Sequence, residues 1–296
     1  MNKKMSDAEL SKRLGAYQVI ERIGTVLGII LIMAGGIIAI VQHNLWIFAG
    51  LFFAGVIVLV IISFIVNTKK NVLLNLQLGD FFHSELQSAF GPGTAEPTML
   101  INVSFLKGAE LIDQCWEGSD ISNFFEGEHN SARFSVANVT LDHLVEERSG
   151  PDNDNWMTKT VTVFSGVIIR CADMCDSNLD MSITDRYQES PPKGDVSDPA
   201  VFAERFKVRT SDGREAAALV TPEMRTLCSE LEKAVDGKLC GLKLKDGEAA
   251  AALHTKYQFA NVPPNTDLRN IDGIRKAYVE SIETLKALLD ILKNNL

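Results

Sequence analysis

The sequence predicts an α+β protein with an N-terminal transmembrane helical hairpin. After the hairpin we expect a cytosolic domain of antiparallel strands with flanking helices and a long C-terminal helix. Three observations predict this class. Two uncharged apolar runs lie close together near the N-terminus. The middle of the chain carries β-branched runs separated by turn residues, and its end carries an apolar stripe at helical spacing.

The two apolar runs cover residues 23–41 and 45–66. At about 1.5 Å of rise per residue, each can cross the roughly 30 Å hydrocarbon core of a bilayer. Only Gln42, His43 and Asn44 separate them, so the connection must be tight. Neither run has the polar face of a core helix, and no small-residue cleavage site of a signal peptide follows the first. The sequence therefore predicts a two-span anchor in a lipid bilayer.

Basic residues predict the orientation of this anchor. Five Lys or Arg residues precede the first span, two follow the second, and the loop between the spans has none. The positive-inside rule then places both termini and the main domain in the cytoplasm. Gly24 and Gly28, followed by Gly35 and Gly36, give the first span a strip of small residues. We expect this strip to pack against the second span, with dimerisation between chains as the alternative.

Charge divides the chain unevenly. Of its 29 basic and 38 acidic residues, seven and three fall in residues 1–70, which leaves 22 basic and 35 acidic residues and a net charge of −13 in residues 71–296. A domain this acidic repels phosphate backbones, so no nucleic-acid partner is expected. The five cysteines are scattered and odd in number, which favours reduced thiols.

Four segments follow from these patterns. Residues 1–22 are expected to be a cytosolic amphipathic segment, with Asp7 as a possible helix cap, and residues 23–66 the transmembrane hairpin. Residues 67–98 should be a membrane-proximal helix and linker, the helix ending before Gly91. Residues 99–296 should form the cytosolic α+β domain.

Strand patterns begin that domain. We expect strands at residues 99–106, 132–144 and 157–174. The polar stretches at residues 147–155 and 188–199 are expected to be a hairpin loop and an exposed connection.

The stretch from Pro199 to Val235 reads as a short helix, a strand over residues 205–210, a turn and a second strand over residues 215–220. Thr221 and Pro222 then supply a capping hydroxyl and a first-turn proline for a helix. This helix should stop at Asp236 and Gly237.

A further hairpin is expected around Asp246 and Gly247. The last helix is predicted over Asp267–Lys293 and carries an apolar stripe at spacings of three and four residues. Packing of the stripe on its own domain is the default, and a coiled coil with another copy is the alternative. The stripe consists of Ile271, Ile274, Tyr278, Ile282, Leu285, Leu289 and Leu292.

The stretch "DPAVFAERFKVRTSDGREAAALVTPEM" resembles the closing signature of a bacterial membrane-anchored family known as domain of unknown function 3137. The stretches Glu117–His143 and Phe164–Asn178 are similar to its preceding strands, although Met174 and Cys175 depart from the usual pattern. The resemblance implies a bacterial inner-membrane location and a LemA-type membrane partner. It implies no activity. The matching residues singled out as the structural signature are Asp198, Pro199, Phe202, Phe206, Asp212, Glu215, Thr221 and Pro222.

Candidate chemistry is sparse. Cys171 and Cys175 could share one face of a strand and bind a metal, but no second Cys or His pair lies nearby in the sequence, so buried thiols are favoured. Phosphate-binding and nucleophile-elbow motifs are missing, and we expect no cofactor. An acidic run that could bind a cation is read as a charged surface. It comprises Asp113, Glu117, Asp120, Glu126 and Glu128.

We therefore expect a protein-binding scaffold or regulator of a membrane complex. It would engage a membrane-protein partner or form a homo-oligomer through the C-terminal helix. The alternative is a membrane-tethered hydrolase or metal-dependent enzyme that uses Asp173, His143 or the cysteines. A transport role is disfavoured because the two spans carry no charged residue.

Overall fold

A computed structural model of the chain describes residues 5–42, 45–94, 97–148, 156–175, 179–186, 194–210, 219–261 and 266–296. The chain divides into two compact units. One comprises residues 1–84 and 264–277, and the other comprises residues 85–263 and 278–296. The fold is α+β, with two long apolar helices at the N-terminus, an antiparallel sheet and a long C-terminal helix.

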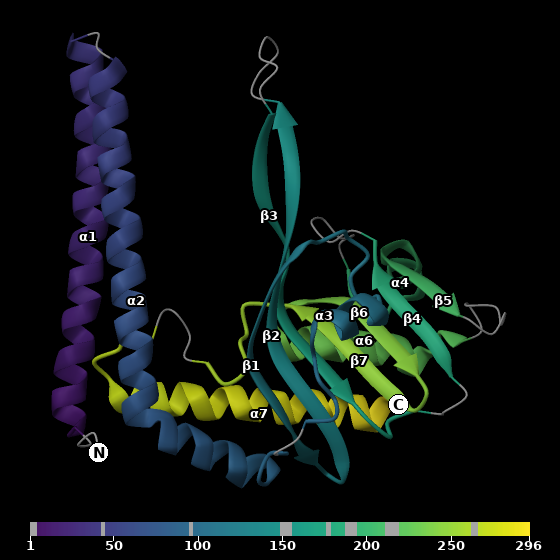
Figure 1. The fold of residues 1–296 in the computed structure, drawn as a ribbon. Coiled ribbons are helices and arrows are strands. Elements are labelled where there is room, and N and C mark those ends of the chain that lie inside the picture. Colours follow the sequence, from purple (N-terminus) through teal and green to yellow (C-terminus); the bar gives the residue numbers. More distant parts are fainter. Residues whose placement is uncertain are drawn as a thin grey trace. The chain divides into compact units, whose positions relative to one another are not determined.

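The first unit is built on helices α1 (Asp7–Gln42) and α2 (Leu45–Phe90), which lie side by side (Figure 1). Helix α1 is capped by Ser6 rather than by Asp7. The Ser6 hydroxyl accepts a hydrogen bond from the backbone N–H of Glu9 at 3.3 Å. The Asp7 carboxylate instead pairs with Arg275 at 2.9 Å. The helix predicted to end before Gly91 is confirmed as the end of α2, and Gly91 follows it with a φ of 78°.

Close packing of α1 on α2 depends on glycine. A Cβ atom at Gly28 would lie 2.4 Å from Leu59, and one at Gly24 would lie 2.6 Å from Ile62. From the other side, a Cβ at Gly55 would lie 2.8 Å from Ile32. These glycines therefore let the two helices approach closely, which confirms packing against the hairpin partner for Gly24 and Gly28 of the predicted strip.

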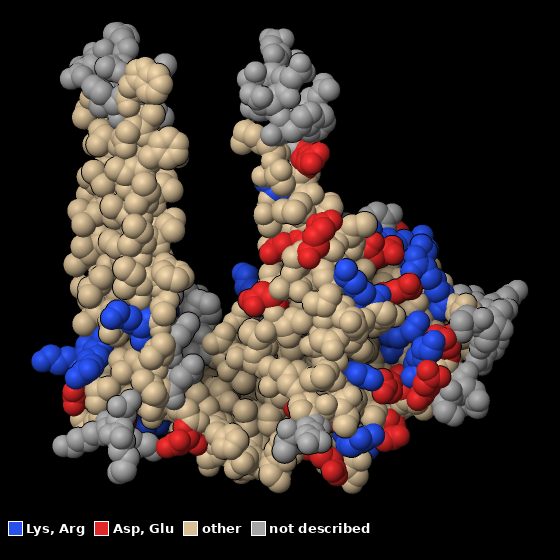
Figure 2. Space-filling model, viewed as in Figure 1, with Lys and Arg blue, Asp and Glu red and all other residues tan. Residues whose placement is uncertain are grey.

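The outer surface of this helix pair is apolar. Of the 23 exposed large hydrophobic side chains among the described residues, 19 lie between Val19 and Leu76. Figure 2 shows most of the length of the pair without charged residues and its Lys and Arg residues gathered at one end. The segments Asp7–Ile38 and Ala49–Leu74 are long and apolar enough to cross a membrane. In an apolar 18-residue stretch of each segment only 17% and 11% is buried, whereas the core helix of a soluble protein would be mostly buried.

The second unit contains a seven-stranded sheet of order β1-β2-β3-β7-β6-β4-β5, with every neighbouring pair antiparallel. This confirms the antiparallel domain that the sequence predicts. The strands are β1 (Gly118–His129), β2 (Ala132–Arg148), β3 (Trp156–Cys171), β4 (Asp180–Asp185), β5 (Phe206–Thr210), β6 (Lys238–Lys245) and β7 (Glu248–His254). The remaining helices of the described chain are α3 (Val103–Ala109), α4 (Pro199–Arg205), α6 (Pro222–Val235) and α7 (Ile271–Asn295).

Helix α3 covers one face of the sheet. Its Leu106 and Ala109 pack in a buried cluster with Val139, Phe164 and Ile168. The sequence prediction of a strand over residues 99–106 is wrong here. The Asn102 side chain accepts a hydrogen bond from the backbone N–H of Phe105 at 2.9 Å and so caps a helix at this point.

Beyond its contacts with the sheet, the β2–β3 hairpin continues as a two-stranded ribbon, visible in Figure 1. Strand β1 pairs with β2 only as far as Asp142, and β7 pairs with β3 only from Gly166 onward. The pairing of Arg148 with Trp156 confirms a hairpin, and its loop at residues 149–155 lies outside the described residues.

Helix α6 contacts β6 and β7 and follows the predicted boundaries. The Thr221 hydroxyl accepts a hydrogen bond from the backbone N–H of Met224 at 3.3 Å, and Asp236 ends the helix in the left-handed region. The expected turn at residues 211–213 and most of the strand at 215–220 fall outside the described residues. Leu219 and Val220, which are described, do not lie in a strand.

The predicted hairpin around Asp246 and Gly247 is confirmed as β6–β7. Helix α7 begins at Ile271 rather than Asp267, because the Asn270 side chain accepts a hydrogen bond from the backbone N–H of Gly273 at 2.9 Å. All seven residues of its predicted apolar stripe are buried within the chain. A homo-oligomer through this helix stays a prediction.

Candidate functional site

His143 and Cys171, two of the residues considered for a hydrolase, lie far apart on the β2–β3 hairpin. Cys171 pairs with Phe134 of β2, whereas His143 lies nine residues further along that strand. At about 3.4 Å per residue this separates them by about 30 Å. The His143 ring is hydrogen-bonded to the Glu117 carboxylate at 3.0 Å.

The two candidate metal ligands have different surroundings. Cys171 is buried, and burial raises the pKa of its thiol to about 12. The Cys175 thiol lies 3.3 Å from the backbone carbonyl of Glu248 and donates a hydrogen bond to it. Within the described ranges, no group of three or more His, Cys, Asp or Glu side chains could hold a metal ion.

Three members of the acidic run serve the structure instead. Buried Glu126 accepts hydrogen bonds from the backbone N–H groups of Thr98 and Met99 at 2.9 and 2.8 Å. Glu117 accepts one from Leu144 at 2.9 Å, and Asp113 pairs with Arg209 at 3.2 Å. A carboxylate already holding N–H donors or a guanidinium is a poor candidate for a shared cation site.

The signature residues, in contrast, gather around α4 and the start of α6. Asp198 caps α4 by accepting a hydrogen bond from the backbone N–H of Ala200 at 2.8 Å, and Pro199 occupies its first turn. Phe202 and Phe206 are buried with their ring centroids 4.9 Å apart. Thr221 and Pro222 begin α6, while Asp212 and Glu215 lie outside the described residues.

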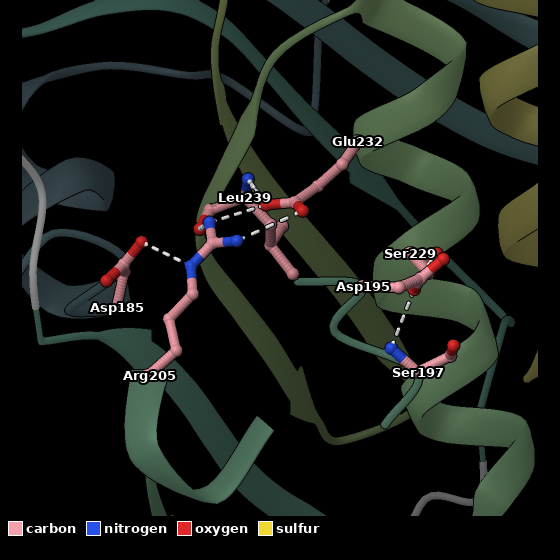
Figure 3. Close-up of polar contacts among 7 residues, drawn as sticks. All are labelled: Asp185, Asp195, Ser197, Arg205, Ser229, Glu232 and Leu239. Atoms are coloured by element: carbon pink, nitrogen blue, oxygen red, sulfur yellow. Dashed lines mark hydrogen bonds and ion pairs between the residues drawn. The ribbon is translucent and has the colours of Figure 1, made fainter. Parts of the chain in front are cut away.

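Arg205, at the end of α4, forms a buried ionic network with Asp185 and Glu232 (Figure 3). Its Nε donates to Asp185 of β4 at 2.9 Å, and its Nη1 and Nη2 donate to Glu232 of α6 at 3.1 and 2.5 Å. The side chains of Arg205 and Asp185 are 4% and 0% exposed. Nη2 also donates to the carbonyl of Leu239 at 3.3 Å, so the network joins α4, β4, α6 and β6.

The network keeps Arg205 charged although it is buried. Burial lowers the pKa of Arg205, but the hydrogen bonds and charges of Glu232 and Asp185 raise it by more, so its pKa lies above the ordinary value. The guanidinium also lies 4.8 Å from the centroid of the Phe206 ring. Such a paired, desolvated cation fixes the relative positions of the elements that supply its partners.

A second polar cluster joins α6 to the segment before α4. The Asp195 carboxylate accepts hydrogen bonds from Lys233 at 2.6 Å, from the backbone N–H of Ser197 at 2.9 Å and from the Ser229 hydroxyl at 2.7 Å. These contacts, led by the one with Lys233, lower the pKa of Asp195. Figure 3 shows this cluster beside the Arg205 network.

The elements that these two clusters hold together, α4, β4 and α6, surround a groove of about 340 Å³. Its apolar lining includes Pro199, Phe202, Phe206 and Val208, from α4 and β5. Two arginines complete it, Arg186 after β4 and Arg225 on the first turn of α6. Three signature residues, Pro199, Phe202 and Phe206, thus line a single surface hollow, which is the candidate functional site.

Neither groove arginine forms an ion pair with a carboxylate in the described part of the chain. Arg225 donates to the backbone carbonyls of Val220 and Ser197 at 3.1 and 3.3 Å. Glu223 is near enough for the charge of Arg225 to help lower the pKa of its carboxyl, after the larger effects of its own backbone N–H and the Thr221 hydroxyl. Cationic groups beside an apolar hollow suit an anionic group joined to an apolar one.

Sequence reasoning did not single out Arg186, Arg205 or Arg225. The one signal was an arginine between Phe202 and Phe206, which is unusual in a segment that must bury both rings. Its acidic partners lie 20 and 27 residues away, so the sequence alone does not identify them.

No family model, curated protein or solved structure matches this chain. The similarity to the family known as domain of unknown function 3137 therefore stays a prediction carried by the quoted residues alone.

Proposed function

We propose that this chain is a membrane-anchored binding protein of the bacterial inner membrane. Helices α1 and α2 form its two-span anchor, and the sheet domain lies in the cytoplasm with both termini. There it acts as a scaffold or regulator of a membrane complex by binding another protein. Membership of the resembled family, and through it a LemA-type membrane partner, belongs to the same proposal.

The observation that carries the proposal is the exposed apolar surface of α1 and α2. Monomeric soluble proteins rarely expose contiguous apolar patches beyond a few hundred Å². Helix α1 exposes large apolar side chains from Val19 to Ile37 and α2 from Phe52 to Leu76, with no acidic or basic residue between Ile23 and Val66. Lipid is the environment that such a surface fits best.

Binding rather than catalysis is supported by the hydrogen bonds that already engage the buried and clustered carboxylates. Asp185, Glu232, Glu126 and Asp195 all receive hydrogen bonds from this same chain. The candidate hydrolase residues His143 and Cys171 lie on separate parts of the β2–β3 hairpin. No specific observation favours the enzyme alternative over the binding proposal.

Extraction and co-purification test this proposal in two stages. The tagged full-length chain should stay with membranes through alkaline carbonate washing and dissolve only in detergent. After mild detergent extraction it should retain a stoichiometric protein partner, identified by mass spectrometry. Release by carbonate would refute the anchor, and a monomer that carries no partner from native membranes would refute the scaffold.

A further inference from the structure

We propose that the groove beside α4 binds an acidic peptide segment of a protein partner. The segment would place an aromatic or aliphatic side chain against Pro199 and Val208, over the buried rings of Phe202 and Phe206, and pair adjoining carboxylates with Arg186 and Arg225. This inference deepens the binding function proposed above and rests on it. It assigns the place of contact and the chemistry of the partner.

The apolar part of the groove requires an apolar side chain from the partner. Phe202 and Phe206 are 3% and 2% exposed, so their rings form a fixed floor. Val208 of β5 and Pro199 of α4 continue the lining on either side. An apolar side chain resting on this lining gains about 25 cal/mol for each Å² of apolar surface removed from water.

The two arginines require carboxylates from the partner. Arg225 is held by carbonyls of the chain, which leaves its positive charge without a paired carboxylate among the described residues. The exposed Arg186 likewise has no ion pair there, and only its backbone N–H is engaged, by the carbonyl of Arg205 at 2.9 Å. Guanidinium groups bind carboxylates through two parallel hydrogen bonds, so a partner that supplies Asp or Glu satisfies both.

The walls of the groove are held in place before any partner arrives. Arg205 ties α4 to β4 and α6, and Asp195 ties the segment before α4 to α6. Arg225 donates to the carbonyl of Ser197 within that same segment. A preorganised groove loses little conformational freedom on binding, which favours recognition of a short segment.

Size and charge favour a peptide over other anionic chains. A volume of about 340 Å³ is at the small end of ligand pockets and suits a few side chains rather than a long acyl chain. A nucleic acid carries a charge on every phosphate and is disfavoured by the net charge of −13 over residues 71–296, whereas a peptide needs only the one or two carboxylates that Arg186 and Arg225 can pair.

The test selects peptides on the full-length protein reconstituted in lipid nanodiscs. A displayed library of random peptides is selected on the wild type, and the recovered peptides are measured by fluorescence anisotropy. They should be enriched in Asp or Glu next to Phe, Leu or Ile. R186E and R225E should each weaken their binding at least tenfold. The matched control R133E alters an exposed arginine of β2, separated from β5 by four strands, and should bind like the wild type.

Three results would overturn the inference. In the first, the selected peptides lack acidic residues. In the second, R186E binds the peptides as tightly as the wild type does. In the third, dodecanoate binds the protein and displaces the peptides at the concentration at which it binds. The last would assign the groove to a fatty carboxylate. Arg186 has no ion pair in the described residues, so the R186E protein should give the same circular dichroism spectrum as the wild type. If R186E still retains the native partner during co-purification, the scaffold survives and only this groove assignment fails.

Discussion

Arg205 illustrates how a single residue can organise this domain. Its guanidinium has left water and is compensated by Asp185, by Glu232 and by the carbonyl of Leu239. Removing one member of a buried ion network leaves the other charges buried and unpaired. The resulting loss of folding free energy is larger than the stability that the intact network adds over an apolar replacement of all its members.

We expect R205M to lower the free energy of unfolding by about 3–5 kcal/mol, because it strands Asp185 and Glu232. The matched control is R209A, since Arg209 is 40% exposed and pairs with Asp113 at 3.2 Å. It should cost less than about 1 kcal/mol. Urea unfolding of both variants in the same detergent gives the comparison. Equal midpoints for R205M and R209A would contradict the structural role of the network.

Asp195 predicts an effect of pH. The hydrogen bond from Lys233, with those from Ser197 and Ser229, holds the folded pKa of Asp195 below its unfolded value of about 3.9. The stabilisation is therefore complete above that value and is lost as the pH falls below it. D195N should be less stable than the wild type at pH 7, and the gap should close in urea titrations below about pH 4. A gap independent of pH would show that the carboxylate charge is not responsible.

Thiol reactivity should separate the cysteines. Burial raises the pKa values of Cys171, Cys228 and Cys240, so these thiols stay protonated as well as inaccessible at pH 8, whereas Cys115 is exposed. Below the unfolded-state pKa of about 8.5 these thiols are protonated in both states, and their contribution to the free energy of unfolding is fully present. At higher pH they ionise in the unfolded chain but not in the folded one, so this contribution declines. A maleimide at pH 8 should label Cys115 first and the three buried cysteines only in urea, as read by peptide mass spectrometry. Labelling of folded Cys171 as fast as Cys115 would contradict its burial.

At the scale of elements, the α1–α2 contact depends on the missing side chain of Gly28. G28L would place carbon atoms where Leu59 already lies, since even a Cβ would be 2.4 Å from it. We expect helix separation, seen as faster proteolysis of residues 1–84 in detergent and a melting temperature several degrees lower. G50L is the control, because a Cβ at Gly50 would have no neighbour within 4 Å. Equal behaviour of both variants would refute the close packing.

Elements with local determinants could be predicted from the sequence. Thr221 and Pro222 begin α6, and Asp236 with Gly237 ends it, because caps and turns act within a few residues. The strand expected over residues 99–106 was wrong because an apolar run this short carries no clear period, and the Asn102 cap decided the outcome.

The candidate site could not be predicted in the same way. The Arg205 network depends on sheet order, which places β4 between β5 and β6 and so brings Asp185 to Arg205. Glu232 reaches the same guanidinium only because α6 contacts β6. Strand order is a long-range property that hydrophobic spacing does not encode. The groove inherits this dependence, so its arginines could not be paired with Phe202 and Phe206 from the sequence.

At the scale of the whole molecule, we propose a membrane anchor joined to a binding domain. The exposed apolar surface of α1 and α2 supports the anchor, and the Arg205 and Asp195 clusters hold elements of the sheet domain together. The central claim is that the chain crosses the membrane twice and keeps the sheet domain on the cytoplasmic side.

The most direct test is labelling with a membrane-impermeant maleimide in spheroplasts. In a C175S background, exposed Cys115 reports on the sheet domain, and N44C reports on the connection between the two spans. Our account predicts that N44C is labelled in intact spheroplasts and that Cys115 is labelled only after permeabilisation. Labelling of Cys115 in intact spheroplasts, or equal access to both positions before permeabilisation, would contradict it.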